Sequence, residues 1–159
     1  MKEIDRISLK SGIWQKEDRH YVTQRLLDRG FSYADELMEL RIFDLLNIYR
    51  INAEVGREII LMLYRICNPN DAVDEGMELM LIDQYFPFTA WRKKHRDLSK
   101  LTVRELVMTE DINHRAIMHF YNSVLKAFFK SEEYNSREYR YYSYDDMLEK
   151  QGQYNEPGR

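Results

Sequence analysis

At 159 residues, with 44% apolar and 13% aromatic content, the chain can build a real core, which excludes a disordered protein. A single cysteine, Cys67, excludes an intramolecular disulfide and a four-cysteine metal site. The sequence has no run of about 18 apolar residues and no leader pattern, so we expect a cytoplasmic protein without a membrane-spanning helix.

The first predicted elements are an arm and a helix. Residues 1–15 contain apolar side chains without clean periodicity, interrupted by Ser-Gly, and we expect them to pack on the body as an arm. Apolar spacing then predicts a helix over 16–29, closed by Gly30 in a left-handed conformation. A short helix follows, for which Ser32 is the expected cap.

The next predicted helices are a short one over 42–48 and a long one over 53–66. In the long helix, apolar residues at i, i+4, i+7 and i+8 form a core stripe, and further apolar residues widen this stripe around most of the helix. Such a helix is typical of a position between two layers. We therefore expect it to be the central element, ended by Asn68 and Pro69.

In the second half, the pattern predicts a helix over 71–85, which a Phe-Pro-Phe motif breaks. The densest basic cluster, WRKKHR at 91–96, leads to Thr102 and Glu105, whose spacing forms a capping box. A closing helix is expected over 114–130. The tyrosine-rich remainder is expected to be a polar extension with one helix around its Tyr-Asp-Asp motif.

One stretch occurs twice. Glu36–Asn52 reads ELMELRIFDLLNIYRIN, and 61 residues later Asp97–Asn113 reads DLSKLTVRELVMTEDIN. The pairs that keep apolar character or identity are Leu37/Leu98, Leu40/Leu101, Ile42/Val103, Leu45/Leu106, Leu46/Val107, Ile51/Ile112 and Asn52/Asn113. We therefore predict an all-α fold of two tandem helix-hairpin-helix-like repeats around a central apolar helix. The predicted divisions are an arm, 1–15, a first repeat, 16–67, a second repeat, 71–130, and a polar tail, 131–159.

A family pattern fits the first copy without a gap at Gly30-Phe31, Glu36-Leu37, Asp44-Leu45-Leu46 and Glu58-Ile59. With these motifs, the segment from Tyr21 to Ile59 resembles the C-terminal domain of the bacterial RNA polymerase alpha subunit. The resemblance implies a compact helical module that binds DNA and transcription factors.

The first copy departs from this family where the family contacts DNA. There, an arginine and an asparagine of the first helix and a glycine, a lysine and a serine of the hairpin make the contacts. The matching positions in this chain are Tyr21, Gln24, Asn52, Glu54 and Val55. Asn52 tolerates the backbone shape of glycine, but Glu54 would repel a phosphate. We expect this copy to serve as a scaffold or as an acidic protein-contact surface.

The second copy is basic. Residues 31–90 carry four basic and eleven acidic side chains, whereas residues 91–130 carry nine and four. At its hairpin, Arg115 places a cation at a helix N-terminus, which favours anions. The predicted nucleic-acid-binding residues are Arg92, Lys93, Lys94, Arg96, Lys100, Arg104, Asn113, His114 and Arg115. Phosphate contacts of this kind predict DNA binding that depends on salt and has a weak sequence preference.

Simpler interpretations stand beside these. WRKKHR fits a solvated segment that neutralises the acidic middle, and Asn52 and Asn113 fit plain helix caps. The spacings of His95, His114 and His119 match no metal pattern. The tail tyrosines either stack on bases or lie along the body or a partner, and they are Tyr134, Tyr139, Tyr141, Tyr142 and Tyr144.

Two functions follow from these patterns. The sequence offers no nucleophile motif, phosphate-binding glycine loop or paired carboxylates, so we expect neither an enzyme nor a cofactor, metal or small-molecule substrate. The first hypothesis is a nucleic-acid-binding or transcription-associated module that acts through the second repeat. The alternative is a protein-interaction adaptor without nucleic-acid contact, which binds its partner through the acidic first repeat or the tail.

Overall fold

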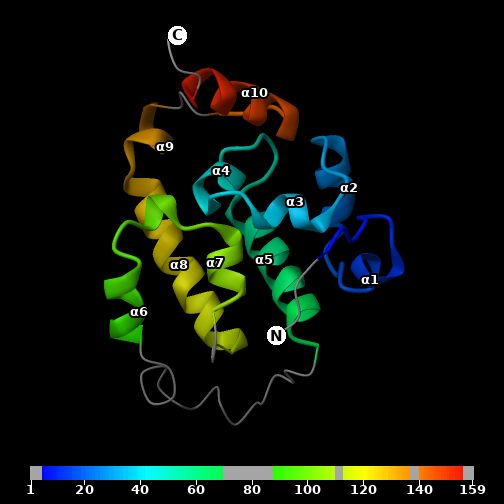
Figure 1. Cartoon of the computed structure of the whole chain (residues 1–159), viewed down its shortest axis with the longest axis horizontal. Coiled ribbons are helices and arrows are strands. Elements are labelled where there is room, and N and C mark those ends of the chain that lie inside the picture. Colours follow the sequence, from blue (N-terminus) through cyan, green and yellow to red (C-terminus); the bar gives the residue numbers. More distant parts are fainter. Residues whose placement is uncertain (1–4, 70–87, 110–112, 137–139, 156–159) are drawn as a thin grey trace.

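The computed structural model describes residues 5–69, 88–109, 113–136 and 140–155. Within these ranges the chain folds into helices joined by isolated β-bridges, so the all-α prediction is confirmed (Figure 1). The helix expected over 71–85 lies outside the described residues.

The N-terminal arm packs on the body, as expected, but it contains a helix. Helix α1 spans Gly12–Gln15, and Ser11 caps it where the Ser-Gly pair was expected to interrupt the chain. Leu9 and Trp14 are fully buried, and the Trp14 indole donates a hydrogen bond of 2.8 Å to the Thr23 hydroxyl. This bond fixes the arm to the next helix.

Helix α2 spans only Val22–Asp28, so the helix expected over 16–29 is too long. Tyr21 adopts a left-handed backbone with φ of 56°, which ends any helix that approaches from the N-terminal side. The Asp18 carboxylate then accepts the Val22 and Thr23 amides at 3.0 and 2.9 Å. Burial raises the pKa of Asp18, but hydrogen bonds from Thr23, Val22 and His20 outweigh it, and the net pKa is lowered.

Helices α3, Ala34–Met38, and α4, Ile42–Leu46, follow. The expected cap Ser32 is displaced by one position, because Tyr33 is the N-cap of α3. The Glu36 carboxylate accepts the amides of both residues at 2.7 Å. A carboxylate three residues into the helix therefore caps this helix start, instead of the expected serine hydroxyl.

Helix α5, Ala53–Cys67, is the central helix, as its wide apolar stripe predicted. It packs against α1, α2 and α4 of the first half and against α7 and α8 of the second. It meets α8 tightly at Gly56, where an added Cβ would stand 2.6 Å from the Tyr121 hydroxyl. That hydroxyl donates to the Ala53 carbonyl at 2.5 Å, so the missing side chain of Gly56 lets the two helices cross.

The second half contains α6, Phe88–Lys94, a 3-10 turn η3, Leu98–Lys100, α7, Val103–Val107, and α8, His114–Lys130. The predicted capping box at the start of α7 is confirmed, because Thr102 and Glu105 bond reciprocally. The Trp91 ring stacks on Phe120 with centroids 4.1 Å apart, which holds α6 against α8.

The two halves correspond at the 61-residue offset in several ways. Helices α4 and α7 occupy corresponding positions, and the long helices that follow them both start after an asparagine cap. The halves also pair directly, because the Ile42 amide donates to the Leu101 carbonyl at 2.9 Å and the Val103 amide to the Leu40 carbonyl at 2.8 Å. The bonds are therefore reciprocal between corresponding residues.

The tail forms helices α9, Glu132–Ser136, and α10, Tyr144–Asn155, which agrees with the helix expected around the Tyr-Asp-Asp motif. It is docked on the body and not a free polar extension. Tyr141 and Met147 are buried, and the backbone of Tyr141 bonds to both Asn47 and Tyr49. Tyr144 stacks on Phe31, with centroids 4.6 Å apart. Together these contacts place α10 beside α4 (Figure 1).

A polar network joins the tail to the N-cap position of α4. Arg41 donates to Asp44 at 2.7 Å and to Glu133 of α9 at 3.0 Å. Gln151 of α10 donates to Asp44 at 3.1 Å. Burial lowers the pKa of Arg41, but the bonds to the two carboxylates outweigh it and raise the pKa above its usual value. Since the Asp44 carboxylate is almost fully buried, Arg41 is its necessary counter-charge.

Candidate nucleic-acid interface

Helix α6 carries the first three predicted contacts in its last turn (Figure 1). Lys93 and Lys94 are exposed, and neither forms an ion pair within the described ranges. Arg92 is half-buried and donates to the His95 carbonyl at 2.9 Å, so it closes its own helix end. Two of the three cations therefore face solvent.

His95 adds no charge to this cluster at neutral pH. Its Nδ1 lies 3.7 Å from the Glu105 carboxylate, and its ring centroid lies 4.8 Å from that of Trp91. Burial lowers its pKa and Lys94 lowers it further, while Glu105 opposes both. His95 therefore connects α6 to α7 as a neutral ring.

Arg96, Lys100 and Arg104 differ in how much of their charge is engaged. Arg96 is exposed, and Lys100 is exposed with only a loose contact, 4.0 Å, to Asp97. Arg104, in contrast, donates to Glu39 of the first half at 2.7 Å. Arg104 therefore links the second half to the first through an ion pair. The Lys100 ammonium, in contrast, stays in solvent.

The start of α8 holds the last three predicted contacts. The Asn113 side chain accepts the Ala116 amide at 2.8 Å, and Asn52 accepts the Val55 amide of α5 at 2.9 Å, so the capping interpretation is confirmed for both. His114 is half-buried and Arg115 is exposed. The hairpin residues before them, 110–112, lie outside the described ranges.

Eight of the nine predicted residues therefore fall into two groups, and the half-buried His114 belongs to neither. Those with a structural role are Arg92, Arg104 and Asn113. Exposed cations remain in the α6–η3 surface, which we define as Lys93, Lys94, Arg96 and Lys100. Arg115 adds a further exposed cation on α8. This surface has the chemistry for phosphate contacts.

The first copy has a second group of cations that the sequence did not reveal. Around the start of α5, one cavity is lined by Arg25, Arg29 and Arg50, and an adjoining one is lined by Arg50 and Arg140. Arg25 and Arg29 lie four residues apart on one helix, which is a weak signal. Nothing in the sequence connects them with Arg140, because the docked tail brings that residue to the site.

In the first copy, the positions at which the resembled family contacts DNA differ in exposure and in hydrogen bonding. Tyr21 is 86% exposed, and Gln24 donates to Asp28 at 2.8 Å. Glu54 is exposed, whereas Val55 is buried in the core. These positions do not form one phosphate-binding surface.

Comparison with protein-family models, with curated proteins and with solved structures gave no match. Within the residues that the structure describes, no helix is long and apolar enough to cross a membrane. In the same residues, no three His, Cys, Asp or Glu side chains are grouped so that they would hold a metal ion.

Proposed function

We propose that this protein is a non-enzymatic nucleic-acid-binding module, associated with transcription, that contacts phosphates through the α6–η3 surface and Arg115. The observation that supports it most directly is the exposure of Lys93, Lys94 and Arg96 without ion pairs in the described ranges. Unpaired cations release counterions when they meet phosphates, which drives association. The sequence likeness to the polymerase alpha C-terminal domain is the reason for placing the module in transcription.

The proposal includes the architecture that presents this surface. We propose that the two halves are copies of one helix-hairpin-helix-like unit. The supporting facts are the corresponding positions of α4 and α7, the two asparagine caps and the reciprocal backbone bonds. An experimental structure in which Leu37, Leu45 and Ile51 do not superpose on Leu98, Leu106 and Ile112 would contradict it.

A salt series on a random DNA duplex tests the binding. We compare Lys93→Glu/Lys94→Glu with the matched control Lys126→Glu/Lys130→Glu, which changes the net charge equally through exposed lysines of α8. The wild type should bind at low salt with a steep salt slope. The plot of log affinity against log salt concentration should become less steep by about 2 in the first variant, because two phosphate contacts are lost. The control should leave this slope nearly unchanged. Equal effects of both variants would show that only net charge matters, and no binding by the wild type would end the proposal.

A further inference from the structure

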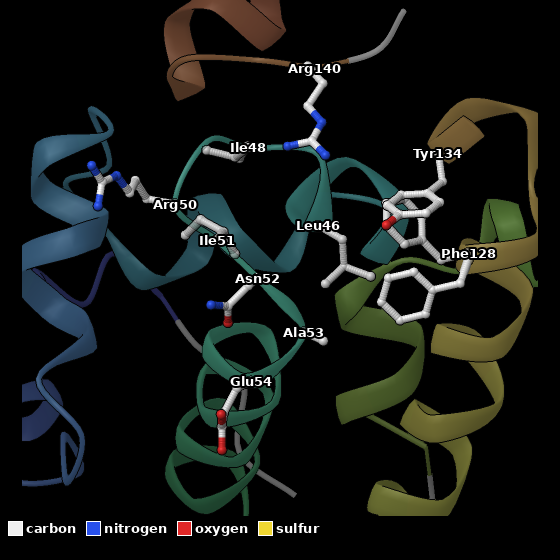
Figure 2. A pocket seen from close by; sticks show the side chains of 11 residues that line it. Leu46, Ile48, Arg50, Ile51, Asn52, Ala53, Glu54, Phe128, Tyr134 and Arg140 are labelled. Atoms are coloured by element: carbon white, nitrogen blue, oxygen red, sulfur yellow. The ribbon is translucent and has the colours of Figure 1, made fainter. Parts of the chain in front are cut away.

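At the start of α5, beside the end of α8, the chain forms a half-open cavity of about 450 Å³ (Figure 2). The cavity is lined by side chains from α4, α5, α8, α9 and the segment before α10. The lining includes Leu46, Arg50, Phe128, Phe129, Tyr134 and Arg140. A cavity of this size accommodates one or two large side chains of a ligand.

The floor of the cavity is apolar, and one wall is aromatic. Leu46, Ile51 and Phe128 are buried, whereas Phe129 is 45% exposed. The Tyr134 ring packs against both phenylalanines, at centroid distances of 5.3 Å to Phe128 and 5.0 Å to Phe129. Because these rings are already packed together, an apolar ligand group would bind without the entropy cost of ordering this wall.

Two arginines, Arg50 and Arg140, line the cavity beside this apolar floor. Figure 2 shows Arg140 directed toward Leu46 and Ile48, while Arg50 points toward α2. There the adjoining cavity, about 390 Å³, is lined by Arg25, Arg29 and Arg50 together with Asp28 and Asn52. Carboxylates are fewer: Asp28 accepts a bond from Gln24, and Glu54 lies farther along α5, away from Arg140.

Two of these arginines are already held in place. The guanidinium carbons of Arg29 and Arg50 lie 5.0 and 5.1 Å from the centroid of the Tyr49 ring. Arg29 also donates to the Tyr142 carbonyl at 3.2 Å. Because Tyr49 restrains both side chains, binding of an anionic group would cost less conformational entropy than with free arginines.

We propose that this end of the molecule binds an acidic peptide segment of a protein partner. One apolar side chain of the peptide enters the cavity between Leu46 and Phe129, and flanking carboxylates pair with Arg50 and Arg140. A nucleic-acid strand fits less well, because an apolar cavity separates the two arginines, whereas a strand presents phosphates without an apolar side chain between them. The inference goes beyond the proposed nucleic-acid binding, which uses a different face.

The test begins with a random heptapeptide display library panned against the full chain. Selected peptides should combine a large apolar residue with at least two acidic ones. A fluorescein-labelled copy of the consensus should lose about tenfold or more in affinity on Arg50→Glu/Arg140→Glu, measured by anisotropy. Lys93→Glu/Lys94→Glu, a matched control that changes the net charge equally on α6, should stay within about twofold.

Several outcomes would overturn the proposal. These are no enrichment, a consensus without acidic residues, or unchanged affinity in the arginine variant. Displacement of the peptide by a random DNA duplex would assign the face to nucleic acid instead. Should the arginine variant fail to fold, amide shift mapping on the wild type decides, since the shifts must include the residues around Ile51 and Phe129. Peptide binding should survive Lys93→Glu/Lys94→Glu, so failure of this inference and failure of the DNA proposal are distinguishable.

Discussion

Helices α5 and α8 begin in the same way and meet different surroundings. Each starts after an asparagine whose side chain accepts the amide three residues on, at 2.9 Å for Asn52 and 2.8 Å for Asn113. Around the first lie an apolar cavity and arginines from distant segments, and around the second lies an exposed arginine of the helix itself. The comparison shows that a shared backbone start does not determine what binds there, because neighbouring elements supply the recognising side chains.

The largest expected effect comes from the residue before α4. Arg41→Ala should destabilise the fold by about 3 kcal/mol, because it leaves the buried Asp44 and the half-buried Glu133 without a counter-charge. Urea unfolding measures the loss. The corresponding residue of the second half offers a matched control, since Thr102→Ala removes only a cap and should cost about 1 kcal/mol. Equal costs would show that the Arg41 network contributes nothing beyond capping.

A smaller effect is expected where α5 crosses α8. Gly56→Ala gains about 1 kcal/mol of helix propensity, but its Cβ would meet the Tyr121 hydroxyl at 2.6 Å. We expect a net loss of about 1 to 2 kcal/mol in the free energy of unfolding. In a Tyr121→Phe background the same substitution should cost less, because only the contact with Leu46 Cδ2 at 3.1 Å remains tight.

The control for that crossing is Gly152→Ala in α10, where an added Cβ meets nothing within 4 Å. It should not lower the melting temperature. If Gly56→Ala behaves like this control, the helices do not cross as closely as described. The position 61 residues after Gly56 is Ile117, which is buried, so the two long helices differ at this point of contact.

The smallest expected effect tests the shared helix starts directly. Asn52→Ala and Asn113→Ala should each cost about 1 kcal/mol, because each removes one capping bond. Asn122→Ala, an exposed site within α8, should cost nothing, since alanine is the better helix former. Asn113→Ala should leave DNA affinity unchanged at conditions where the protein is folded. A large loss of DNA affinity would instead support the sequence-based prediction that Asn113 contacts nucleic acid.

Local patterns predicted much of this fold. The apolar spacing of α5 and α8, the two asparagine caps and the Thr102–Glu105 box depend on residues within a few positions, and each agrees with the structure. The prediction failed before Val22, where the side chain of Asp18 and the left-handed Tyr21 override apolar spacing. Periodicity does not register a single residue with positive φ.

The candidate sites were less predictable than the fold. Exposure of Lys93 and Lys94 could be expected from charge alone, but the engagement of Arg104 with Glu39 depends on packing between halves. The arginine group at α5 was missed because Arg140 arrives with the tail, which composition suggested was a polar extension. Docking of Tyr141 and Met147 agrees instead with the alternative in which the tail tyrosines lie along the body, and only long-range contacts decide between the two.

The paired bonds between Leu40 and Val103 and between Ile42 and Leu101 have a consequence for how the chain unfolds. Each half supplies the carbonyl acceptor for an amide of the other half. Neither half can therefore satisfy these two amides until the distant segments of the chain have come together. Separation of the halves would expose both amides at once. Hydrogen exchange at Ile42 and Val103 should therefore report the same free energy of opening, because one event that separates the halves exposes both amides.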